Sequence, residues 1–376
     1  MNVTVVGAGP AGMMSAIAAA SRGKKVTLME KNDRLGKKLA ITGGGRCNLT
    51  YATDTESLIQ HVVNNPSFLY SAFYTFGSES LMRFFEGRGI SLKTEEGRVF
   101  PQSERARDII KVLEDALKEY KVQVMLNHPV RDISQILKQG GKVIVATGGL
   151  SYPDTGSTGD GYRWAKQLGH AVVDMRPSLV PLHGDALGLA GLSLKSVKLT
   201  INNYSKVGNL IFTHRGLSGP VVLEASQHFR PGMTVTIDLM PYLSQNELDK
   251  LLIKLFKRYP NKSVGNLLSG TLPKRLVPFL LETPLVKANF FTKKSRSSLV
   301  KIIKNFKFNA KAAGGFNEAI ITAGGVDVRQ INPSDMSSKK VSGLYFAGEV
   351  LDVDALTGGF NLQIAFSTGY AAGCSV

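Results

Sequence analysis

The sequence predicts an α/β protein whose parallel sheet is built from both ends of the chain. A β-branched run at residues 3–6 leads into a glycine-rich turn and then into a helix of small residues. A second strand follows at 25–29, and two more strand-like runs that end in glycine lie at 142–149 and 343–350. Strands that alternate with helices in this way form a parallel sheet covered by helices.

The first of these segments contains a strand, a glycine-rich turn and a helix in the order found in dinucleotide-binding domains. Its turn is Gly7-Ala8-Gly9-Pro10-Ala11-Gly12. In such a turn, Gly7 permits the tight bend, Gly9 lets the backbone approach a pyrophosphate, and Gly12 lets the helix pack close to the sheet. The N–H groups and the positive dipole end at the start of the helix then face the phosphates. The segment therefore predicts a Rossmann-like nucleotide-binding domain.

A carboxylate ends the second predicted strand. Glu30 lies eighteen residues after Gly12, at the position where a carboxylate accepts hydrogen bonds from both ribose hydroxyls. A negative charge there disfavours a 2′-phosphate. The pattern therefore favours FAD or NAD over NADP.

Other glycine-rich segments suit a backbone that lies against a diphosphate or a flavin ring. One is Thr42-Gly43-Gly44-Gly45-Arg46-Cys47-Asn48, and another is Thr357-Gly358-Gly359, which precedes a helix of small residues that runs to Ala372. The N-terminus of that helix can face the N1–C2=O region of a reduced flavin and stabilise its negative charge. These segments favour a flavin.

Together these motifs resemble those of the YhiN/BaiN-type NAD(P)/FAD-dependent oxidoreductases. That family is similar to the glutathione-reductase-like, two-dinucleotide-binding-domain flavoproteins and has aminoacetone-oxidase-like relatives. The resemblance is carried by GAGPAG at 7–12, RLGKK at 34–38, TGGGRCN at 42–48, ATGG at 146–149 and LYFAGEVLDVDALTGGFNLQ at 344–363. It covers most of the chain. It implies a glutathione-reductase-like FAD-binding domain, with FAD as the cofactor.

Individual cofactor contacts are implied by the same resemblance. It implies pyrophosphate contacts at Gly7, Gly9, Ala11 and Gly12, and a ribose contact at Glu30. The other cofactor contacts, most of them on the flavin side, are Lys31, Lys38, Gly44, Gly45, Arg46, Cys47, Asn48, Thr147, Gly148, Gly348, Glu349, Gly359 and Asn361.

The resemblance also implies that the backbone of Val130 contacts the adenine, after a strand-like run that begins near Val122. Here the sequence departs from the family. The segment between Val130 and Val143 is too short for the β-meander that commonly joins these landmarks. Either a shorter connection replaces the meander in this chain, or residues are missing from the sequence.

The middle of the chain is predicted to be an insertion. Alternating runs at 197–201 and 234–238 predict a small β-barrel or sandwich. Ser244 and Glu247 have the spacing of a capping box before a leucine-rich helix. The predicted domains are an FAD-binding domain at 1–174 and 320–376, a β-barrel substrate domain at 175–240 and about 310–319, and a helical subdomain at 241–309.

Candidates for catalysis are few. His214, in a polar turn of the predicted barrel, is a candidate acid–base or substrate-positioning group, although a structural turn histidine is the simpler interpretation. Cys47 is a candidate redox thiol, but the chain has no CxxC motif, so a packed small side chain is again simpler. No residues have metal-ligand spacing, and we expect no metal.

The composition favours anionic partners. Among 376 residues, Lys and Arg number 46 and Asp and Glu 29, which gives a net charge of +17. The run of cations from Lys293 to Lys311 contains no acid, which predicts either a solvated helical face or attraction for an anionic substrate or RNA. Two cysteines, Cys47 and Cys374, and no apparent membrane segment favour the reducing cytoplasm.

The leading hypothesis is an FAD-dependent oxidoreductase that acts on a small organic substrate by hydride transfer at flavin N5. Amine oxidation and reduction of an enone C=C bond stay open. The alternatives are an FAD-containing RNA-binding or tRNA-modifying protein and a non-catalytic flavin sensor. The sequence has no RNA-binding module, which argues against a specific nucleic-acid partner. It also has no second strand–glycine–helix–acid arrangement between 150 and 340, so any NAD(P)H is expected to visit the substrate face transiently. The oligomeric state stays open.

Overall fold

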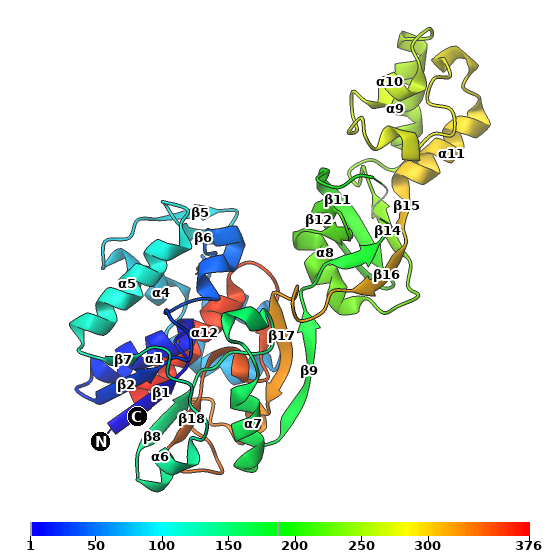
Figure 1. Cartoon of the computed structure of the whole chain (residues 1–376). Helices are drawn as coiled ribbons and strands as arrows, with labels where there is room; N and C mark the ends of the chain where they lie inside the picture. The colour runs from blue at the N-terminus through cyan, green and yellow to red at the C-terminus, as the bar shows by residue number, and fades with distance from the viewer. Residues whose placement is uncertain (1, 186–187) are drawn as a thin grey trace. The chain divides into compact units, whose positions relative to one another are not determined.

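The computed structural model describes residues 2–185 and 188–376. Met1, in the predicted FAD-binding range, and residues 186–187, in the predicted barrel range, lie outside the described residues. The chain divides into two compact units (Figure 1). One is Met1–Ser178 with Phe316–Val376, here called the terminal unit, and the other is Leu179–Gly315, here called the inserted unit.

The terminal unit is built on a five-stranded sheet. Its strands lie in the order β18 (Leu344–Phe346), β8 (Lys142–Val145), β1 (Asn2–Val6), β2 (Lys25–Met29) and β7 (Gln123–Met125). All neighbouring strands are parallel. Strands β18, β8 and β1 are almost entirely buried and apolar, as expected where both faces of a sheet are covered. The predicted α/β sheet that joins the two ends of the chain is confirmed.

Two helices of small residues, α1 (Pro10–Ala20) and α12 (Phe360–Ser375), pack against each other (Figure 1). Their backbones come close because α12 presents glycines to α1. A Cβ atom added at Gly369 would lie 2.4 Å from the backbone oxygen of Ala11, and Gly373, one turn later, meets α1 in the same way. The C-terminal helix is thereby held on the helix that follows the glycine turn.

Smaller elements complete the terminal unit. Helix α5 (Ala106–Glu119) packs against α1. The antiparallel pair β9 (Val172–Ser178) and β17 (Ile321–Val326) carries the chain into and out of the inserted unit. The connection from β7 to β8 contains one short helix, α6 (Ser134–Lys138). The other helices and strands are α2 (Thr55–Gln60), α3 (Tyr70–Thr75), α4 (Ser78–Glu86), α7 (Asp160–Gln167), β3 (Thr50–Tyr51), β4 (Val62–Asn64), β5 (Leu92–Glu95), β6 (Arg98–Pro101) and β19 (Asp354–Ala355).

The inserted unit contains a seven-stranded antiparallel sheet. Its strand order is β15 (Phe306–Phe308), β14 (Val235–Asp238), β11 (Ser193–Ile201), β12 (Tyr204–Thr213), β13 (Gly216–Ser218), β10 (Leu182–Gly184) and β16 (Ala310–Ala313). The strands at the two edges, β15 and β16, are separated in the chain by Asn309 alone. The sheet therefore curls back on itself in the manner of a barrel.

The helices of the inserted unit are α8 (Pro220–Ala225), α9 (Gln245–Arg258), α10 (Val264–Leu268) and α11 (Lys293–Lys304). Helix α9 begins with the predicted capping box, in which Ser244 and Glu247 each accept a hydrogen bond from the other's backbone N–H. Apolar residues of these helices and of the sheet belong to one hydrophobic core. The separation of 241–309 as a subdomain of its own stays a prediction.

Candidate cofactor site

The glycine turn between β1 and α1 is shaped by two close backbone approaches. Gly7 has a φ of +100°, and a Cβ atom there would lie 2.5 Å from the backbone oxygen of Ala146. A Cβ atom at Gly12 would lie 1.8 Å from the backbone oxygen of Gly7. At Gly9, by contrast, a Cβ atom would meet no described atom within 4 Å. The turn therefore leaves open space at the start of α1, where unpaired helix N–H groups favour an anion such as a diphosphate.

Glu30 is buried at the end of β2 and is already held by three donors. Its Oε2 accepts from the backbone N–H of Ala8 at 2.7 Å. Its Oε1 accepts from the backbone and side-chain nitrogens of Asn32, at 2.9 and 2.7 Å. A carboxylate offers about four acceptor sites, so about one remains for a ribose hydroxyl in this arrangement. Glu30 thus fixes the turn, and its contact with a ribose stays a prediction.

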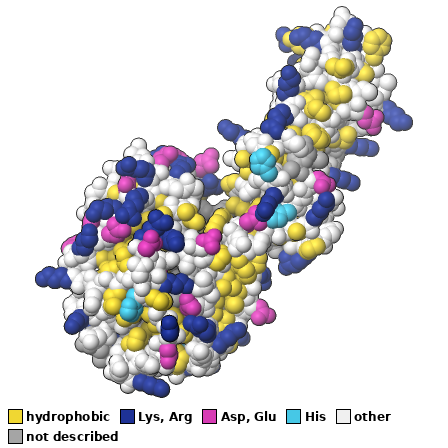
Figure 2. Space-filling model, in the orientation of Figure 1, with side chains coloured by type: hydrophobic (Ala, Val, Ile, Leu, Met, Phe, Trp, Pro, Cys, Tyr) yellow, Lys and Arg dark blue, Asp and Glu magenta, His cyan; other side chains and the backbone are white. Residues whose placement is uncertain are grey.

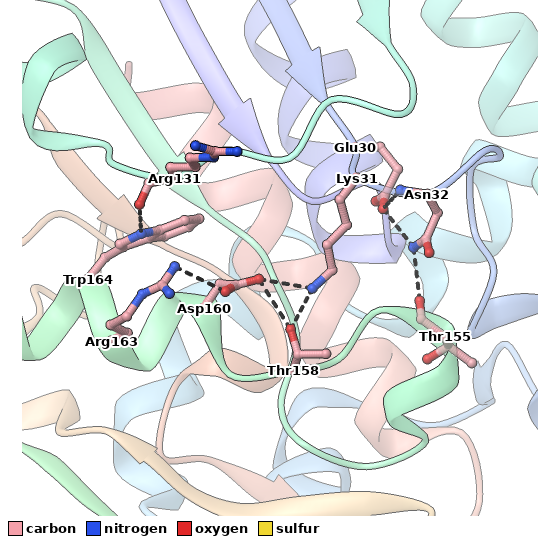
Figure 3. Close-up of polar contacts among 9 residues, drawn as sticks. All are labelled: Glu30, Lys31, Asn32, Arg131, Thr155, Thr158, Asp160, Arg163 and Trp164. Atoms are coloured by element: carbon pink, nitrogen blue, oxygen red, sulfur yellow. Dashed lines mark hydrogen bonds and ion pairs between the residues drawn. The ribbon is translucent and has the colours of Figure 1, made fainter.

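The segment that contains Val130 lies beside Glu30. The N–H of His128 donates to the backbone oxygen of Glu30 at 2.8 Å. The indole N–H of Trp164 donates to the backbone oxygen of Arg131 at 3.0 Å (Figure 3). Val130, between these two anchored residues, is partly buried. The structure therefore brings together the residues predicted to contact ribose and adenine.

Lys31 is bound within the chain. Its ammonium lies 2.9 Å from Asp160 Oδ2 and 2.5 Å from Thr158 Oγ1 (Figure 3). Asp160 also accepts from Arg163 at 3.1 Å. Burial alone would raise the pKa of Asp160, but the hydrogen bond and charge of Lys31 lower it below its ordinary value. Lys31 therefore joins the end of β2 to the start of α7, and its contact with the cofactor stays a prediction.

Three buried polar atoms of predicted flavin contacts have no hydrogen-bond partner among the described residues. They are Thr147 Oγ1, Asn48 Oδ1 and Arg46 Nε. Leaving such an atom unpaired costs roughly 1–3 kcal/mol, so each is expected to have a partner in the functional protein. A Cβ atom at Gly44 or Gly45 would meet no described atom within 4 Å. These features fit a bound cofactor that supplies hydrogen-bonding groups and fills the space.

Lys38 and Glu349 are bound to each other. Lys38 Nζ lies 2.8 Å from Glu349 Oε2 and 2.5 Å from Ser151 Oγ. The other oxygen of Glu349 accepts from Ser151 Oγ and from the backbone N–H of Thr322, both at 2.8 Å. Gly148, which has a φ of +72°, begins the loop that carries Ser151. This network joins four segments around the predicted flavin side. The sequence analysis did not select Ser151 or Thr322, and no motif marks Thr322.

Arg46 forms ion pairs within the chain, and Cys47 is buried. The Arg46 guanidinium lies 2.8 Å from carboxylate oxygens of both Glu95 and Glu104, and 4.3 Å from the centroid of the Phe100 ring. Cys47 is fully buried, and this burial raises the pKa of its thiol to about 12. A thiol in that state is not an active nucleophile at neutral pH. The structure therefore gives no support to a redox role for Cys47.

The remaining predicted flavin contacts hold the start of α12. A Cβ atom at Gly348 would lie 2.7 Å from the Cβ atom of Ala11, and one at Gly359 would lie 2.6 Å from the backbone of Thr50. The Asn361 side chain accepts a hydrogen bond from the backbone N–H of Ala355 and donates one to the carbonyl oxygen of Ala355, both at 2.9 Å. The contact at Gly359 places the N-terminus of α12 against β3, and Gly348 lies against α1.

His214 is exposed in the turn between β12 and β13 of the inserted unit. Its catalytic role stays a prediction.

Among residues 2–185 and 188–376, no three His, Cys, Asp or Glu side chains gather as they would around a metal ion. Of the helices in the same ranges, none has the length and apolar character needed to cross a membrane.

The family match and the similar proteins each cover nearly the whole chain. Residues 1–375 match the family described as HI0933-like protein Rossmann domain. The chain is 33% identical to a ribosomal RNA dihydrouridine synthase of Haemophilus influenzae, over 99% of this chain and 97% of that protein. It is 34% identical to the Escherichia coli protein of the same name, over 98% and 96%. It is 30% identical to a 3-dehydro-bile acid delta(4,6)-reductase of Clostridium scindens, over 99% and 98%.

The resemblance to YhiN/BaiN-type flavoproteins is thereby confirmed, and with it the cofactor, FAD. The open space beside Gly9 and the unpaired polar atoms of Thr147 and Asn48 fit that cofactor. This chain belongs to the HI0933-like Rossmann-domain family and is an FAD-dependent oxidoreductase.

Proposed function

We propose that this oxidoreductase reduces a carbon–carbon double bond conjugated to a carbonyl group, and that its substrate is a uracil base in ribosomal RNA. The observation that carries the proposal is the pair of relatives named ribosomal RNA dihydrouridine synthase, each matched over nearly its whole length. The third relative is named for the reduction of a bile acid.

The activities for which these relatives are named share one chemistry. Uracil has a C5=C6 bond conjugated to its C4 carbonyl, and dihydrouridine has that bond saturated. A 3-oxo steroid with delta(4,6) bonds has double bonds conjugated to its C3 carbonyl. In both, hydride adds to a carbon of the conjugated system and a proton adds to its neighbour. Reduction of this kind, rather than amine oxidation, is therefore the chemistry that we propose for this chain.

FAD supplies the hydride from N5 of its reduced ring when it is bound. The glycine turn and Glu30 would hold the diphosphate and the ribose. Thr147 and Asn48 would hydrogen-bond to the cofactor through their unpaired oxygens. The Lys38–Glu349 pair would fix the segments around it. The two electrons come from NAD(P)H, and a proton from water or from an acid of the chain completes the product.

The choice of RNA over a small enone has a second support in the charge of the chain. The excess of cations, +17, suits a polyanionic substrate better than a neutral or singly charged one. A small conjugated enone is the second candidate, and the bile acid reductase favours it.

The test is direct. The FAD-loaded protein is incubated with NADH or NADPH and ribosomal RNA from cells that lack the gene, and the digested nucleosides are analysed by mass spectrometry. Dihydrouridine is expected only with enzyme and reductant. Parallel reactions contain a delta(4,6)-3-oxo steroid and a panel of amines. Reduction of the steroid alone would replace RNA by a small enone, and anaerobic bleaching of the flavin by an amine would overturn the proposed reduction.

A further inference from the structure

The inserted unit carries most of the net positive charge of the chain. In Leu179–Gly315, Lys and Arg outnumber Asp and Glu by 20 to 6, whereas in the rest of the chain the numbers are 26 and 23. On the face drawn in Figure 2, Lys and Arg side chains are spread over this unit with few acids among them. The charge therefore belongs to one unit and is not a general property of the surface.

The cations of the run from Lys293 to Lys311 are not equivalent. Three have carboxylate partners: Arg296 lies 2.6 Å from Asp249, Lys304 lies 2.6 Å from Asp238, and Lys311 lies 2.9 Å from Asp185. The other four are exposed, and none forms an ion pair with a carboxylate in the described part of the chain. They are Lys293, Lys294, Lys301 and Lys307.

The position of two of these lysines argues against a role in stability. Lys293 and Lys294 lie in the first turn of α11, which has no acidic residue there. A cation at a helix N-terminus is disfavoured by the helix dipole. An anionic partner would remove this cost, whereas folding alone gives no reason for the arrangement.

The last turn of α11 borders a hollow of about 630 Å³. Two of the unpaired cations, Lys301 and Lys307, line it together with the amides of Gln245 and Asn305 and the apolar residues Phe279, Ile302 and Phe306. Phe279 is 39% exposed, so part of its ring is available to a ligand. The volume lies within the range of ligand sites, roughly 300–1,000 Å³. We call this hollow the α11 groove.

The chemistry of the α11 groove is that of a site for single-stranded nucleic acid. Ammonium groups bind phosphates, an exposed aromatic ring stacks on a base, and side-chain amides bind base edges. The lysines and amides would also suit an acidic peptide, but an exposed ring beside ammonium groups matches the alternation of base and phosphate along a single strand. The combination therefore favours RNA.

We propose that the α11 groove docks a single-stranded segment of the RNA substrate, with Lys301 and Lys307 on phosphates and Phe279 on a base. The choice of RNA as the occupant rests on the proposed function. The groove would add affinity and orientation outside the cofactor site, since it lies wholly within the inserted unit.

The test uses the full-length, FAD-loaded protein and a fluorescein-labelled RNA hairpin with a uridine-rich loop. Its dissociation constant is measured by anisotropy over a series of KCl concentrations. In Lys301→Gln/Lys307→Gln we expect roughly tenfold weaker binding and a salt slope smaller by roughly 1.4, because each phosphate contact to a single strand contributes roughly 0.7. In Phe279→Leu, which keeps an apolar side chain, we expect roughly tenfold weaker binding with an unchanged slope.

The matched control is Lys254→Gln/Lys257→Gln. Both residues are exposed on α9 of the same unit, and the pair removes the same charge. We expect its affinity to stay within about twofold of the wild type. Thermal unfolding and FAD content establish that all variants are folded. An equal loss in the control and in the groove variant would overturn the proposal, because binding would then depend on the charge of the unit and not on the groove.

The docking site and the proposed function fail differently. If the wild type forms dihydrouridine in ribosomal RNA and Lys301→Gln/Lys307→Gln does so with an unchanged KM, the groove is not the docking site, although the proposed function stands. If RNA binds through the groove but no dihydrouridine forms, the docking site stands and the proposed function fails.

Discussion

Glu30 accepts a hydrogen bond from the backbone N–H of Ala8 at 2.7 Å, so the end of β2 is fixed to the glycine turn. The carboxylate is 8% exposed and is satisfied by donors from both sides. Hydrogen bonds to a charged acceptor are about twice as strong as neutral ones. Position 30 therefore influences the shape of the turn in addition to any contact with ribose.

The first prediction concerns Glu30→Ala. The substitution leaves the N–H of Ala8 buried without an acceptor, which costs roughly 1–3 kcal/mol, and it removes a ribose partner. We expect weaker FAD binding by fluorescence titration and a lower Tm of the FAD-free protein. A dissociation constant like that of the wild type would mean that another residue binds the ribose. An unchanged Tm would mean that the turn does not depend on Glu30.

The second prediction separates two glycines of the turn. Gly9 has φ −78° and ψ −175° and open space around it, so Gly9→Val is expected to fold normally and to lose FAD. Gly12→Ala places a Cβ atom on the backbone oxygen of Gly7, and it is expected to destabilise the FAD-free protein by about 1–3 kcal/mol. Thermal unfolding and the absorbance of the bound flavin measure both effects. Normal FAD content in Gly9→Val would contradict the assigned phosphate position.

The features that could be predicted from the sequence are set by neighbouring residues. The turn at 7–12 with the strands on either side of it, and the Ser244–Glu247 capping box, each depend on a short stretch of chain. The fold class followed because these local patterns repeat at both chain ends.

Contacts between distant segments could not be predicted in this way. Lys38 and Glu349 were both selected as cofactor contacts, but nothing in either motif indicates that they pair with each other. In the run from Lys293 to Lys311, the sequence does not distinguish Lys304, which has a largely buried carboxylate partner, from Lys301, which has none among the described residues. That difference arises only when β14 is placed beside α11.

The third prediction follows from that difference. Lys304 Nζ lies 2.6 Å from Asp238 and donates to the backbone oxygens of Met240 and Leu243. Its side chain is 11% exposed. Removing one partner of a buried pair costs about 3–5 kcal/mol, so Lys304→Met is expected to lower the free energy of unfolding strongly. Lys301→Met, on the exposed side of the same helix, is expected to change it by less than about 0.5 kcal/mol. Denaturant titration compares the two, and similar effects would contradict the structural role of Lys304.

The fourth prediction concerns Cys47. With the thiol pKa raised to about 12 by burial, the thiolate fraction at pH 8 is on the order of 10⁻⁴. In Cys374→Ser, which leaves Cys47 as the single cysteine, iodoacetamide is expected to modify the denatured protein fully and the native protein negligibly. Mass spectrometry measures the extent. Cys47→Ala is expected to retain FAD and turnover. Rapid alkylation of the native protein, or loss of turnover without loss of FAD, would restore Cys47 as a redox candidate.

The last prediction concerns Asp354, which is 2% exposed. Burial raises the pKa of its carboxyl above the ordinary value of 3.8, although a hydrogen bond from Asn64 opposes the shift. A folded-state pKa above the unfolded value means that the unfolded state releases its proton first as the pH rises. The contribution to stability is therefore full below pH 3.8 and is lost as the pH rises through the folded pKa.

Asp354→Asn keeps an oxygen that accepts from Asn64 but removes the charge that burial penalises. We expect the variant to have a higher Tm than the wild type at pH 7 and the difference to shrink as the pH is lowered toward 4. Asp132 is the control, because hydrogen bonds from Ser134 lower the pKa of its carboxyl, so Asp132→Asn is expected to lower the Tm at pH 7. Differential scanning calorimetry across this range measures both differences. A Tm gain for Asp354→Asn that is equal at all pH values would show that packing, and not the buried charge, governs this position.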